Sequence, residues 1–457
     1  MSLHGKRVVV MGLGRFGGGV GVSRFLVSRG AKVLVTDTAP PDQLRASLAQ
    51  LADLPIDYRL GEHRIEDFTA ADLVVVNPAV DPRQNIYLRA AAEAGVPTTS
   101  EIRLLTSHLP NRNHTIGITG SAGKSTVTAM IGHILQHARD TVGSPSPGRV
   151  FVGGNLGGSL LPHLDTITPD DWVVLELSSF MLEGLAVDRW SPHIAVLTNL
   201  APNHLDRHGS MEAYARAKQA IFDHQQAQDM AILGPIDSPW IQPHVSRTVR
   251  LDHPAAGTPV PDLPLPGEHN RLNAQLAVEA TAAAGIDRAT AAAALATFHG
   301  LPHRLQLVAE RGDVRYFNDS KATTPDAAML AIAGFPPGTV HVILGGYDKG
   351  SDLTAIAQLA RRHCRCIYTI GATGDRIAAL AAAAPGDAEI LPCHTLDNAV
   401  RATADRIHAG DVVLLSPGCA SYDQFDNYES RGHAFTQAVL LYTGEGAPPP
   451  RAQSAGE

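Results

Sequence analysis

The sequence predicts an α/β protein of three successive domains, and three observations lead to this prediction. The chain has 457 residues, which corresponds to about three domains of ordinary size. Apolar runs of strand length, such as Met230–Leu233, Cys366–Ile370 and Val412–Leu415, alternate with helix-like segments. Glycine-rich turns follow early strands of the first two modules, as in nucleotide-binding folds. We expect a Rossmann-like N-terminal domain, a central P-loop ATPase-like domain and a Rossmann-like C-terminal domain. The expected bounds are residues 1–100, 101–301 and 302–443, followed by a disordered tail at 444–457.

The composition is that of a globular enzyme without strong charge bias. The net charge of −8 argues against a general nucleic-acid-binding protein, which usually carries a basic surface. The four cysteines show no disulfide framework and no convincing zinc spacing, so we expect small buried residues in a reducing compartment. No signal peptide and no apolar run long enough to cross a bilayer is recognisable. These features predict a cytoplasmic protein that binds no membrane.

The N-terminal module contains a dinucleotide-binding fingerprint. An apolar strand, Lys6 to Met11, leads into Gly12-Leu-Gly14-Arg-Phe-Gly17, and Asp37 closes the next strand 20 residues after Gly17. Alone, this pattern suggests an NAD enzyme. Its physical content is less specific, because it only places a diphosphate at a helix N-terminus and a carboxylate near a sugar hydroxyl. Any nucleotide diphosphate could meet those requirements.

The central module contains a variant P-loop, Gly117-Ile-Thr-Gly120-Ser-Ala-Gly123-Lys124-Ser125-Thr126, ahead of a predicted helix from Val127 to His137. In such a loop, backbone N–H groups surround phosphates, a lysine reaches the terminal phosphates and the next hydroxyl ligates Mg²⁺. The strict spacing requires glycine where this chain has Ile118. The alternative is a glycine turn with a solvent-exposed lysine. The combination Gly-Lys-Ser-Thr at a helix start favours ATP binding.

Polar residues follow several predicted strands of the same module. Asn155 lies between glycines, which indicates a close backbone approach or a flexible turn. Glu176 ends a buried apolar run, where P-loop proteins keep a Mg²⁺ ligand. His204 and Asp206 come just beyond another strand, at the usual ligand-binding edge of an α/β sheet. Lys218 lies on a predicted helix, and its spacing alone indicates only a solvated lysine.

The remaining candidates lie on the last helix of the central module and in the C-terminal module. Asn270 and Asn273 share one helix face and could either cap the helix or bind an adenine. Arg304, at the domain boundary, could reach a phosphate. Three polar clusters follow strands of the last module, and together they predict one site at the carboxyl edge of its sheet; they are Asn318–Thr323, Gly345–Lys349 and Ser416–Asp423.

These motifs resemble, in order, those of the Mur ligase family. The resemblance rests on Gly-Gly-Asn-Leu-Gly, Glu-Leu-Ser-Ser-Phe, Asn-His-Leu-Asp, Glu-His-Asn-x-x-Asn, Asn-Asp-Ser-Lys-Ala-Thr and Ser-Pro-x-Cys-Ala-Ser-x-Asp-Gln-Phe, and covers nearly the whole chain. It implies UDP-binding, ATP-binding and amino-acid-binding domains, with closure of the last domain. It implies a monomer that acts on UDP-N-acetylmuramoyl-L-alanine and glutamate through an acyl phosphate, using ATP and Mg²⁺ at two sites.

The resemblance also implies roles for individual residues. Lys124, His204 and Lys218 are expected to be catalytic, with Lys218 carbamylated. The metal ligands are expected to be Ser125, Glu176, His204 and Lys218. The expected nucleotide-binding residues are Gly120, Ser121, Ala122, Gly123, Lys124, Ser125, Thr126, Asn270, Asn273, Arg304 and Asp319. The expected substrate-binding residues are Gly14, Arg15, Phe16, Asp37, Thr38, Asn77, Asn155, Ser178, Lys321, Thr323, Lys349, Ser421, Tyr422 and Tyr428.

Three departures from the family pattern bear on specificity. Arg15 and Phe16 replace a common hydroxyl-containing pair, Met181 replaces a common glutamine, and Tyr428 stands where phenylalanine is usual. The resemblance implies that the added amino acid is D-glutamate. A sister ligase that adds L-glutamate to the same precursor shares the motifs and remains an alternative. A dehydrogenase would not need Lys124 with the strand-end polar residues. A non-catalytic P-loop protein would not explain the three C-terminal clusters, and a folate-type ligase would not be expected to carry the N-terminal domain.

Overall fold

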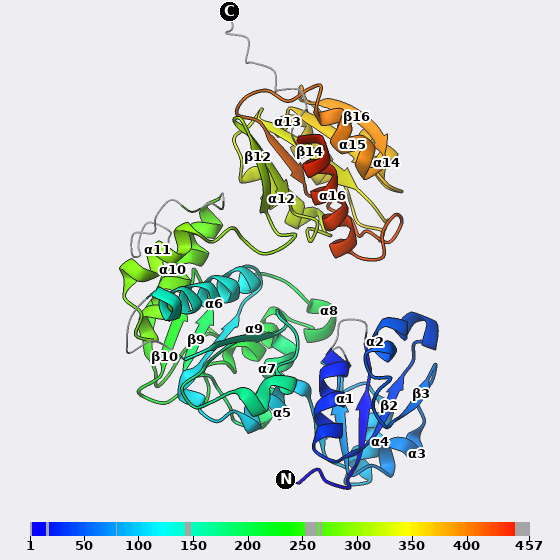
Figure 1. Ribbon diagram of the computed structural model, residues 1–457, viewed down its shortest axis with the longest axis vertical. Coiled ribbons are helices and arrows are strands. Elements are labelled where there is room, and N and C mark those ends of the chain that lie inside the picture. Colours follow the sequence, from blue (N-terminus) through cyan, green and yellow to red (C-terminus); the bar gives the residue numbers. More distant parts are fainter. Residues whose placement is uncertain are drawn as a thin grey trace, which may run out of the picture. The chain divides into compact units, whose positions relative to one another are not determined.

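The computed structural model describes residues 2–14, 18–78, 80–141, 148–251, 263, 265 and 267–443. The chain forms two compact units, which are described separately; the first contains Met1–Pro261 and Arg271–Ala296, and the second contains Asp262–Asn270 and Thr297–Glu457 (Figure 1). The predicted substrate contacts at Arg15 and Phe16, and the tail at 444–457, lie outside the described residues. The domain bounds stay a prediction.

The first sheet is a five-stranded parallel sheet in the order β3-β2-β1-β4-β5. Its strands are β1 (Arg7–Met11), β2 (Lys32–Asp37), β3 (Ile56–Leu60), β4 (Leu73–Val76) and β5 (Thr98–Thr99). Its helices are α1 (Gly18–Ser28), α2 (Arg45–Ala49), α3 (Ile65–Thr69) and α4 (Ile86–Glu93). The strand order reverses between β1 and β4, so the glycine-rich turn after β1 opens at a topological switch point, where open α/β sheets bind ligands.

The second sheet has six parallel strands in the order β11-β10-β9-β6-β8-β7. Its strands are β6 (Thr115–Thr119), β7 (Val150–Gly154), β8 (Trp172–Glu176), β9 (Ile194–Leu197), β10 (Met230–Leu233) and β11 (Arg247–Arg250). The helices are α5 (Glu101–His108), α6 (Lys124–Thr141), α7 (Ser179–Val187), α8 (Leu205–His208), α9 (Met211–Gln219), α10 (Glu268–Ala283) and α11 (Arg288–Ala296). Because β6 lies between β8 and β9, the P-loop that follows β6 has both neighbouring strand ends beside it.

The second unit contains a six-stranded sheet in the order β12-β13-β17-β14-β15-β16, with only β12 antiparallel among these strands. The strands are β12 (Gln306–Arg311), β13 (Val314–Asn318), β14 (Val340–Gly345), β15 (Cys366–Ile370), β16 (Glu389–His394) and β17 (Val412–Leu415). The helices are α12 (Pro325–Ala333), α13 (Thr354–His363), α14 (Gly374–Ala382), α15 (Leu396–Thr403) and α16 (Tyr428–Thr443). The polar clusters follow β13, β14 and β17, which are neighbours in the sheet, as the sequence predicted.

Apolar packing joins the first two sheets into one unit. Leu26 of α1, Leu105 of α5 and Leu161 after β7 are all buried in the same hydrophobic cluster, which continues from the first sheet into the second. The burial of apolar side chains on both sheet faces explains the nearly continuous valine, isoleucine and leucine runs of the central strands. The polar edge strands β3, β12 and β16 lack such runs, and the sequence analysis did not identify them.

The three-domain α/β fold predicted from the sequence is confirmed. No helix in the described ranges is long and apolar enough to span a bilayer. The cysteines are free and buried, as expected; they are Cys364, Cys366, Cys393 and Cys419. Burial raises the pKa of each thiol, in Cys366 to about 12. These thiols therefore stay protonated and unreactive at neutral pH.

Asp171 connects the starts of β7 and β8. Its Oδ1 accepts a hydrogen bond from the Arg149 backbone N–H at 2.7 Å, and its Oδ2 accepts from the Thr168 N–H at 2.8 Å and from Arg149 Nη2 at 2.8 Å. Burial alone would raise the pKa of Asp171, but the hydrogen bonds from Arg149 and Thr168 lower it to about 2. The ionised carboxylate therefore stabilises the folded state.

We expect Asp171→Asn to lower the free energy of unfolding of the central domain by about 1.5–3 kcal/mol at pH 7, because hydrogen bonds to a buried charge are lost. The folded pKa lies below the usual value of about 3.9, so the wild-type advantage is complete above that value and fades as the pH falls toward 2. The difference in unfolding free energy can be measured by urea unfolding, followed by the fluorescence of Trp172, Trp190 and Trp240, which all lie in this domain. An advantage that stays constant from pH 5 to pH 3 would contradict this assignment.

Candidate functional site

The P-loop connects β6 to α6 through two glycines that no other residue could replace without strain. Gly120 has a φ of 148°, and a Cβ there would lie 1.9 Å from Thr198 Oγ1. Gly123 has a φ of 78°, and a Cβ there would lie 2.5 Å from Asn273 Oδ1. Ile118, the departure from strict Walker spacing, is fully buried within β6. It belongs to the strand, so the loop does not need glycine at that position.

The end of β9 holds the loop in place. Thr198 Oγ1 donates to the Ala122 carbonyl at 2.6 Å, and Asn199 Oδ1 accepts from the Ala122 N–H at 2.9 Å. Ser121 Oγ donates to the Ala201 carbonyl at 2.8 Å. The loop conformation is therefore set by side chains of a neighbouring strand, before any ligand binds. The N–H groups of Ser121 and Ala122 both donate to Asn199, so in this conformation they fix the loop and are not offered to a ligand.

Two lysines meet at one carbonyl of the P-loop. The Nζ atom of Lys124 donates to the Gly120 carbonyl at 2.9 Å, and the Nζ atom of Lys218 donates to the same oxygen at 2.8 Å. Lys218 is 1% exposed, so the expectation of a solvated lysine is wrong. Burial, with a smaller contribution from the positive charge of Lys124, lowers the pKa of Lys218 to about 6. Its amine is therefore mostly neutral at pH 7.

Glu176 ends β8 beside the P-loop, and one of its carboxylate oxygens has an unsatisfied position. Its Oε1 accepts a hydrogen bond from Asn155 Nδ2 at 2.7 Å. Its Oε2 is buried and has no hydrogen-bond partner in the described part of the chain. A buried carboxylate oxygen without a partner is costly unless a cation or water completes it. Ser125, in the first turn of α6, is also buried. This donor set fits a Mg²⁺ ion.

His204 lies just beyond β9 in a left-handed conformation with a φ of 52°, immediately before α8. Its ring contacts Phe180 of α7, with ring centroids 5.2 Å apart. Burial, followed by the positive charge of Lys124, lowers the pKa of His204 below its ordinary value. A neutral imidazole is the form that ligates metals. In the described ranges no three His, Cys, Asp or Glu side chains are already grouped as a metal cage.

The asparagines of α10 lie within the helix, which begins at Glu268, so the helix-cap alternative does not account for them. Both are buried, and the side chain of Asn273 lies against Gly123 of the P-loop. Asn273 is therefore placed where a nucleotide on the loop would be close to it. Asn270 is assigned to the second compact unit.

A cavity of about 260 Å³ opens at the switch point of the first sheet, where the UDP-substrate site is expected. Its lining includes Gly12, Gly14 and Asn77 from the first sheet, with Asn155 and Glu101 from the central domain. Burial raises the pKa of Glu101, which the sequence analysis had not selected. In the sequence, Glu101 is recognisable only as an acidic residue at the start of a helix. Such a residue usually interacts with the helix dipole and does not indicate a binding site.

Three predicted substrate residues of the first unit have other roles or no cavity contact. Asp37 is nearly buried, and its two carboxylate oxygens accept from the Gly14 N–H at 3.2 Å and the Ala39 N–H at 2.8 Å. It thus shapes the glycine turn. Ser178 caps α7 by accepting from the Met181 N–H at 3.2 Å, and Thr38 is exposed. Their contact with a substrate stays a prediction.

In the second unit, Asp319 follows β13 and is buried. Its Oδ2 accepts from Ser416 Oγ at 2.7 Å, and its Oδ1 accepts from the Leu305 N–H at 3.1 Å. Burial raises the pKa of Asp319 to about 7, although these hydrogen bonds and the charge of Arg304 act in the opposite direction. Asp319 therefore links Ser416, just after β17, to Leu305, just before β12, through hydrogen bonds.

The predicted glutamate residues lie around the same sheet edge. The Nζ atom of Lys321 is 5.6 Å from the ring centre of Tyr428, and that of Lys349 is 5.8 Å from the ring centre of Tyr422. Ser421 is buried, whereas Tyr422 is 57% exposed. Thr323 is partly exposed. Two lysines and several hydroxyls at one edge match the needs of a ligand with two carboxylates.

Arg431, on α16, holds this edge together and was missed by the sequence analysis. Its guanidinium donates to the carbonyls of Ser320 at 2.9 Å, Cys419 at 3.1 Å and Ala420 at 3.1 Å, and to Ser320 Oγ at 3.0 Å. Its side chain is 1% exposed, and burial lowers its pKa to about 10, so it remains charged at neutral pH. An arginine on a helix usually indicates a solvated face, and no local pattern distinguished this one.

We expect Lys218→Met to be more stable to heat than the wild type at pH 6.5, with a difference that shrinks as the pH rises toward 10. Between pH 6 and the usual lysine pKa of 10.5, the unfolded chain binds a proton that the folded chain has released, so Lys218 makes wild-type stability rise with pH. Thermal midpoints across this range test it. The matched control is Lys32→Met at an exposed strand position, where no such trend is expected. A difference independent of pH would contradict the assignment.

Comparisons with known proteins agree with this geometry. Three family descriptions match successive parts of the chain: Mur ligase MurD-like, N-terminal domain, at residues 6–100; Mur ligase middle domain, at 118–254; and Mur ligase, glutamate ligase domain, at 303–419. The UDP-N-acetylmuramoylalanine–D-glutamate ligase of Roseiflexus sp. is 40% identical, covering 97% of this chain and 100% of that protein. That of Koribacter versatilis is 38% identical, covering 96% and 98%.

Solved structures show the same fold at lower sequence identity. The UDP-N-acetylmuramate–alanine ligase of Thermotoga maritima is 21% identical, with a TM-score of 0.58 over 95% of this chain and 99% of that one. The MurF ligase of Thermotoga maritima, solved in complex with ADP, is 16% identical, with a TM-score of 0.54 over 96% and 95%. Given the three domain matches and the full-length relatives, the chain belongs to the Mur ligase family.

Proposed function

We propose that this protein is the ATP-dependent ligase that joins D-glutamate to UDP-N-acetylmuramoyl-L-alanine in the synthesis of peptidoglycan precursors. The observation that carries the proposal is the carboxyl edge of the central sheet. There the P-loop follows β6, and Glu176, which has one carboxylate oxygen without a partner in the described chain, ends the neighbouring strand β8. The neutral amine of Lys218 contacts the same loop. The full-length relatives, which bear the D-glutamate ligase name, support the choice of substrates.

The chemistry starts from a carboxylate, which is a poor acyl donor. In the proposed first step, an oxygen of the L-alanine carboxylate attacks the γ-phosphorus of ATP, and ADP leaves. In the second step the free amine of glutamate attacks the acyl phosphate carbon, inorganic phosphate leaves, and the amine loses a proton as the amide forms. Positioning and neutralisation of charge account for most of the rate in such reactions.

Lys124 is the proposed phosphate-binding cation. In the structure its amine donates to the carbonyls of Gly120 and Ser121, within the loop that would surround the phosphates. A short movement of this flexible side chain would exchange these carbonyls for phosphate oxygens. The N–H of Gly123, just before α6, is proposed as a further donor, because those of Ser121 and Ala122 are already bonded to Asn199. In this arrangement Lys124 provides the positive charge, and the loop provides a hydrogen-bond donor in a fixed direction.

Ser125, Glu176 and His204 are the residues that we propose as Mg²⁺ ligands. Glu176 offers the buried Oε2 atom that has no partner in the described chain, and Ser125 and His204 offer a hydroxyl and a neutral imidazole. Bound Mg²⁺ supplies charge neutralisation for the phosphates. Asn155 holds the second oxygen of Glu176, which fixes the direction in which the free oxygen points.

Lys218 is the proposed site of carbamylation. A neutral amine reacts with CO₂, and the low pKa of Lys218 means that its amine is mostly neutral at physiological pH. The amine nitrogen bonds to the carbon of CO₂ and loses one proton to solvent, which leaves an anionic carbamate in place of a buried amine. The carbamate would lie beside Lys124, whose amine shares the Gly120 carbonyl with Lys218, and the positive charge of Lys124 would stabilise it.

Phosphate release is the direct test of this function. We expect purified protein with Mg-ATP and UDP-N-acetylmuramoyl-L-alanine to release phosphate when D-glutamate is added. We expect no release when L-glutamate is added or when no amino acid is present. Release with L-glutamate alone would keep the mechanism and reassign the substrate to the sister reaction. Release without any amino acid would favour a simple ATPase. Lys124→Ala should reduce release below detection while its tryptophan emission and melting stay those of the wild type.

Arg431 should set the affinity for glutamate without touching it. Arg431→Lys keeps the charge but loses the forked donors to Ser320, Cys419 and Ala420, so the loops move. Because each lost hydrogen bond from a buried charge is worth about 1.5–3 kcal/mol, we expect the KM for glutamate to rise at least tenfold. The KM for ATP should change less than twofold. Arg406→Lys, in the same domain, is the matched control. An equal rise in both KM values would assign Arg431 to general stability.

A further inference from the structure

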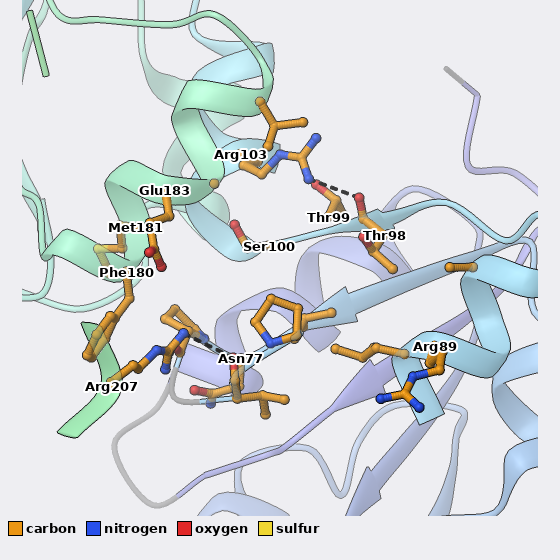
Figure 2. A pocket seen from close by; sticks show the side chains of 18 residues that line it. Asn77, Arg89, Thr98, Thr99, Ser100, Arg103, Phe180, Met181, Glu183 and Arg207 are labelled. Carbon is orange, nitrogen blue, oxygen red and sulfur yellow. Dashed lines mark hydrogen bonds between the residues drawn. The ribbon is translucent and has the colours of Figure 1, made fainter. Parts of the chain in front are cut away.

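A cavity of about 410 Å³ lies within the first unit, between the end of the first sheet and α7 (Figure 2). Its walls are mostly apolar: Val76, Pro78 and Leu88 come from the N-terminal domain, and Met181 and Val187 come from α7. This volume is in the range of sites for small organic ligands, about 300–1,000 Å³. Of the described residues expected to bind substrate, only Asn77 lines this cavity.

The cavity adjoins the proposed UDP-substrate site but extends away from it. Both are lined by Val76, Asn77, Pro78 and Met181, so they share one wall. The rest of the substrate cavity is lined by the glycine turn after β1, whereas this cavity continues along α4 and β5 toward Val187. A ligand seated against α4 would therefore leave the glycine turn open.

The cavity lining carries three arginines, Arg89, Arg103 and Arg207, against one carboxylate, Glu183, so its charges favour an anionic ligand. Arg103 is neutralised by Asp188, with Nε–Oδ2 and Nη2–Oδ1 distances of 2.7 and 2.5 Å. Arg207 donates to the carbonyls of Pro78 at 3.0 Å and Val80 at 3.2 Å. Arg89, on α4, is exposed at the rim, and no hydrogen bond or ion pair of its guanidinium occurs with any described residue. It offers an unbalanced positive charge beside apolar walls.

Two residues of the cavity wall also hold the candidate metal ligand His204. The guanidinium of Arg207 lies over the Phe180 ring, 3.9 Å from its centroid. The Phe180 ring also contacts the ring of His204. Figure 2 shows Phe180 and Arg207 close together on the α7 side of the cavity. Phe180 is also only four positions after Glu176. Any ligand that packs against these side chains therefore acts on residues next to the catalytic edge.

We propose that this cavity binds a small molecule with an apolar body and a single anionic group, and that its occupancy slows ligation. The apolar body lies between Leu88 and Val187, and the anion lies at Arg89. The ligand fixes Phe180 and Arg207, and so hinders the adjustment of His204 when substrates bind. The effect on rate rests on the proposed function, whereas the binding itself does not.

The probe for this site is 8-anilinonaphthalene-1-sulfonate, which combines an aromatic body with one sulfonate and fluoresces when bound in an apolar environment. We expect saturable one-site binding to the native protein. Ala92→Trp, at an exposed α4 position on the cavity wall, should abolish it by filling the space, while Ala92→Ser should keep it. Arg89→Ala should weaken it about fivefold, the upper range for an exposed ion pair, and Arg89→Lys should restore most of the loss.

Controls separate this site from non-specific binding and from the substrate site. Leu330→Ser removes an exposed apolar side chain of the second unit and should leave probe binding unchanged. Binding that survives Ala92→Trp, or that disappears at saturating UDP-N-acetylmuramoyl-L-alanine, would overturn the proposal. In the phosphate-release assay the probe should lower kcat in the wild type and not in Ala92→Trp. If no phosphate is released even without the probe, the proposed function fails, and the binding experiment still decides the site.

Discussion

The placement of two lysine amines on one backbone carbonyl constrains the whole catalytic edge. The amines of Lys124 and Lys218 both donate to the Gly120 oxygen, and two full positive charges at that separation repel each other strongly in a buried site. The protein resolves the conflict by burying Lys218, so that its amine gives up its proton near pH 6. This difference in charge underlies the roles proposed above, with Lys124 as the phosphate-binding cation and Lys218 as the reactive amine. The backbone on either side of Gly120 is held by hydrogen bonds from the Thr198 N–H to the Thr119 carbonyl at 3.0 Å and from the Ser121 N–H to the Asn199 carbonyl at 3.1 Å.

The same logic extends along the sheet. β8, β6 and β9 are neighbours, so their carboxyl ends bring a carboxylate, a phosphate-type loop and an imidazole to one edge. Glu176 Oε2 has no hydrogen-bond partner among the described residues, and burial lowers the pKa of His204. The proposed function would place an anion at the loop and a metal ion at Glu176 and His204. A buried carboxylate oxygen without a partner is unfavourable by itself, and such locally unfavourable features are typical of active sites.

Sequence reasoning identified what local patterns encode, and missed what depends on packing between distant segments. The P-loop, Glu176 and the three polar clusters were predictable because strand ends of parallel sheets converge at one edge. The burial of Lys218 was not, because it depends on the packing of α9 under the loop. Arg431 was not, because its partner Ser320 lies 111 positions away in the sequence. The edge strands were missed because their mixed polarity carries no clear period.

The chemistry of the thiols has a practical consequence for work in solution. All four cysteines are buried, and burial holds each thiol in its protonated form at neutral pH. Maleimides and other thiol reagents attack the thiolate, so the native chain presents almost no target to them. A single cysteine introduced at an exposed position would consequently be the dominant reactive thiol. Spectroscopic labels can therefore be attached one at a time to either unit, with every native cysteine left in place and the core packing intact.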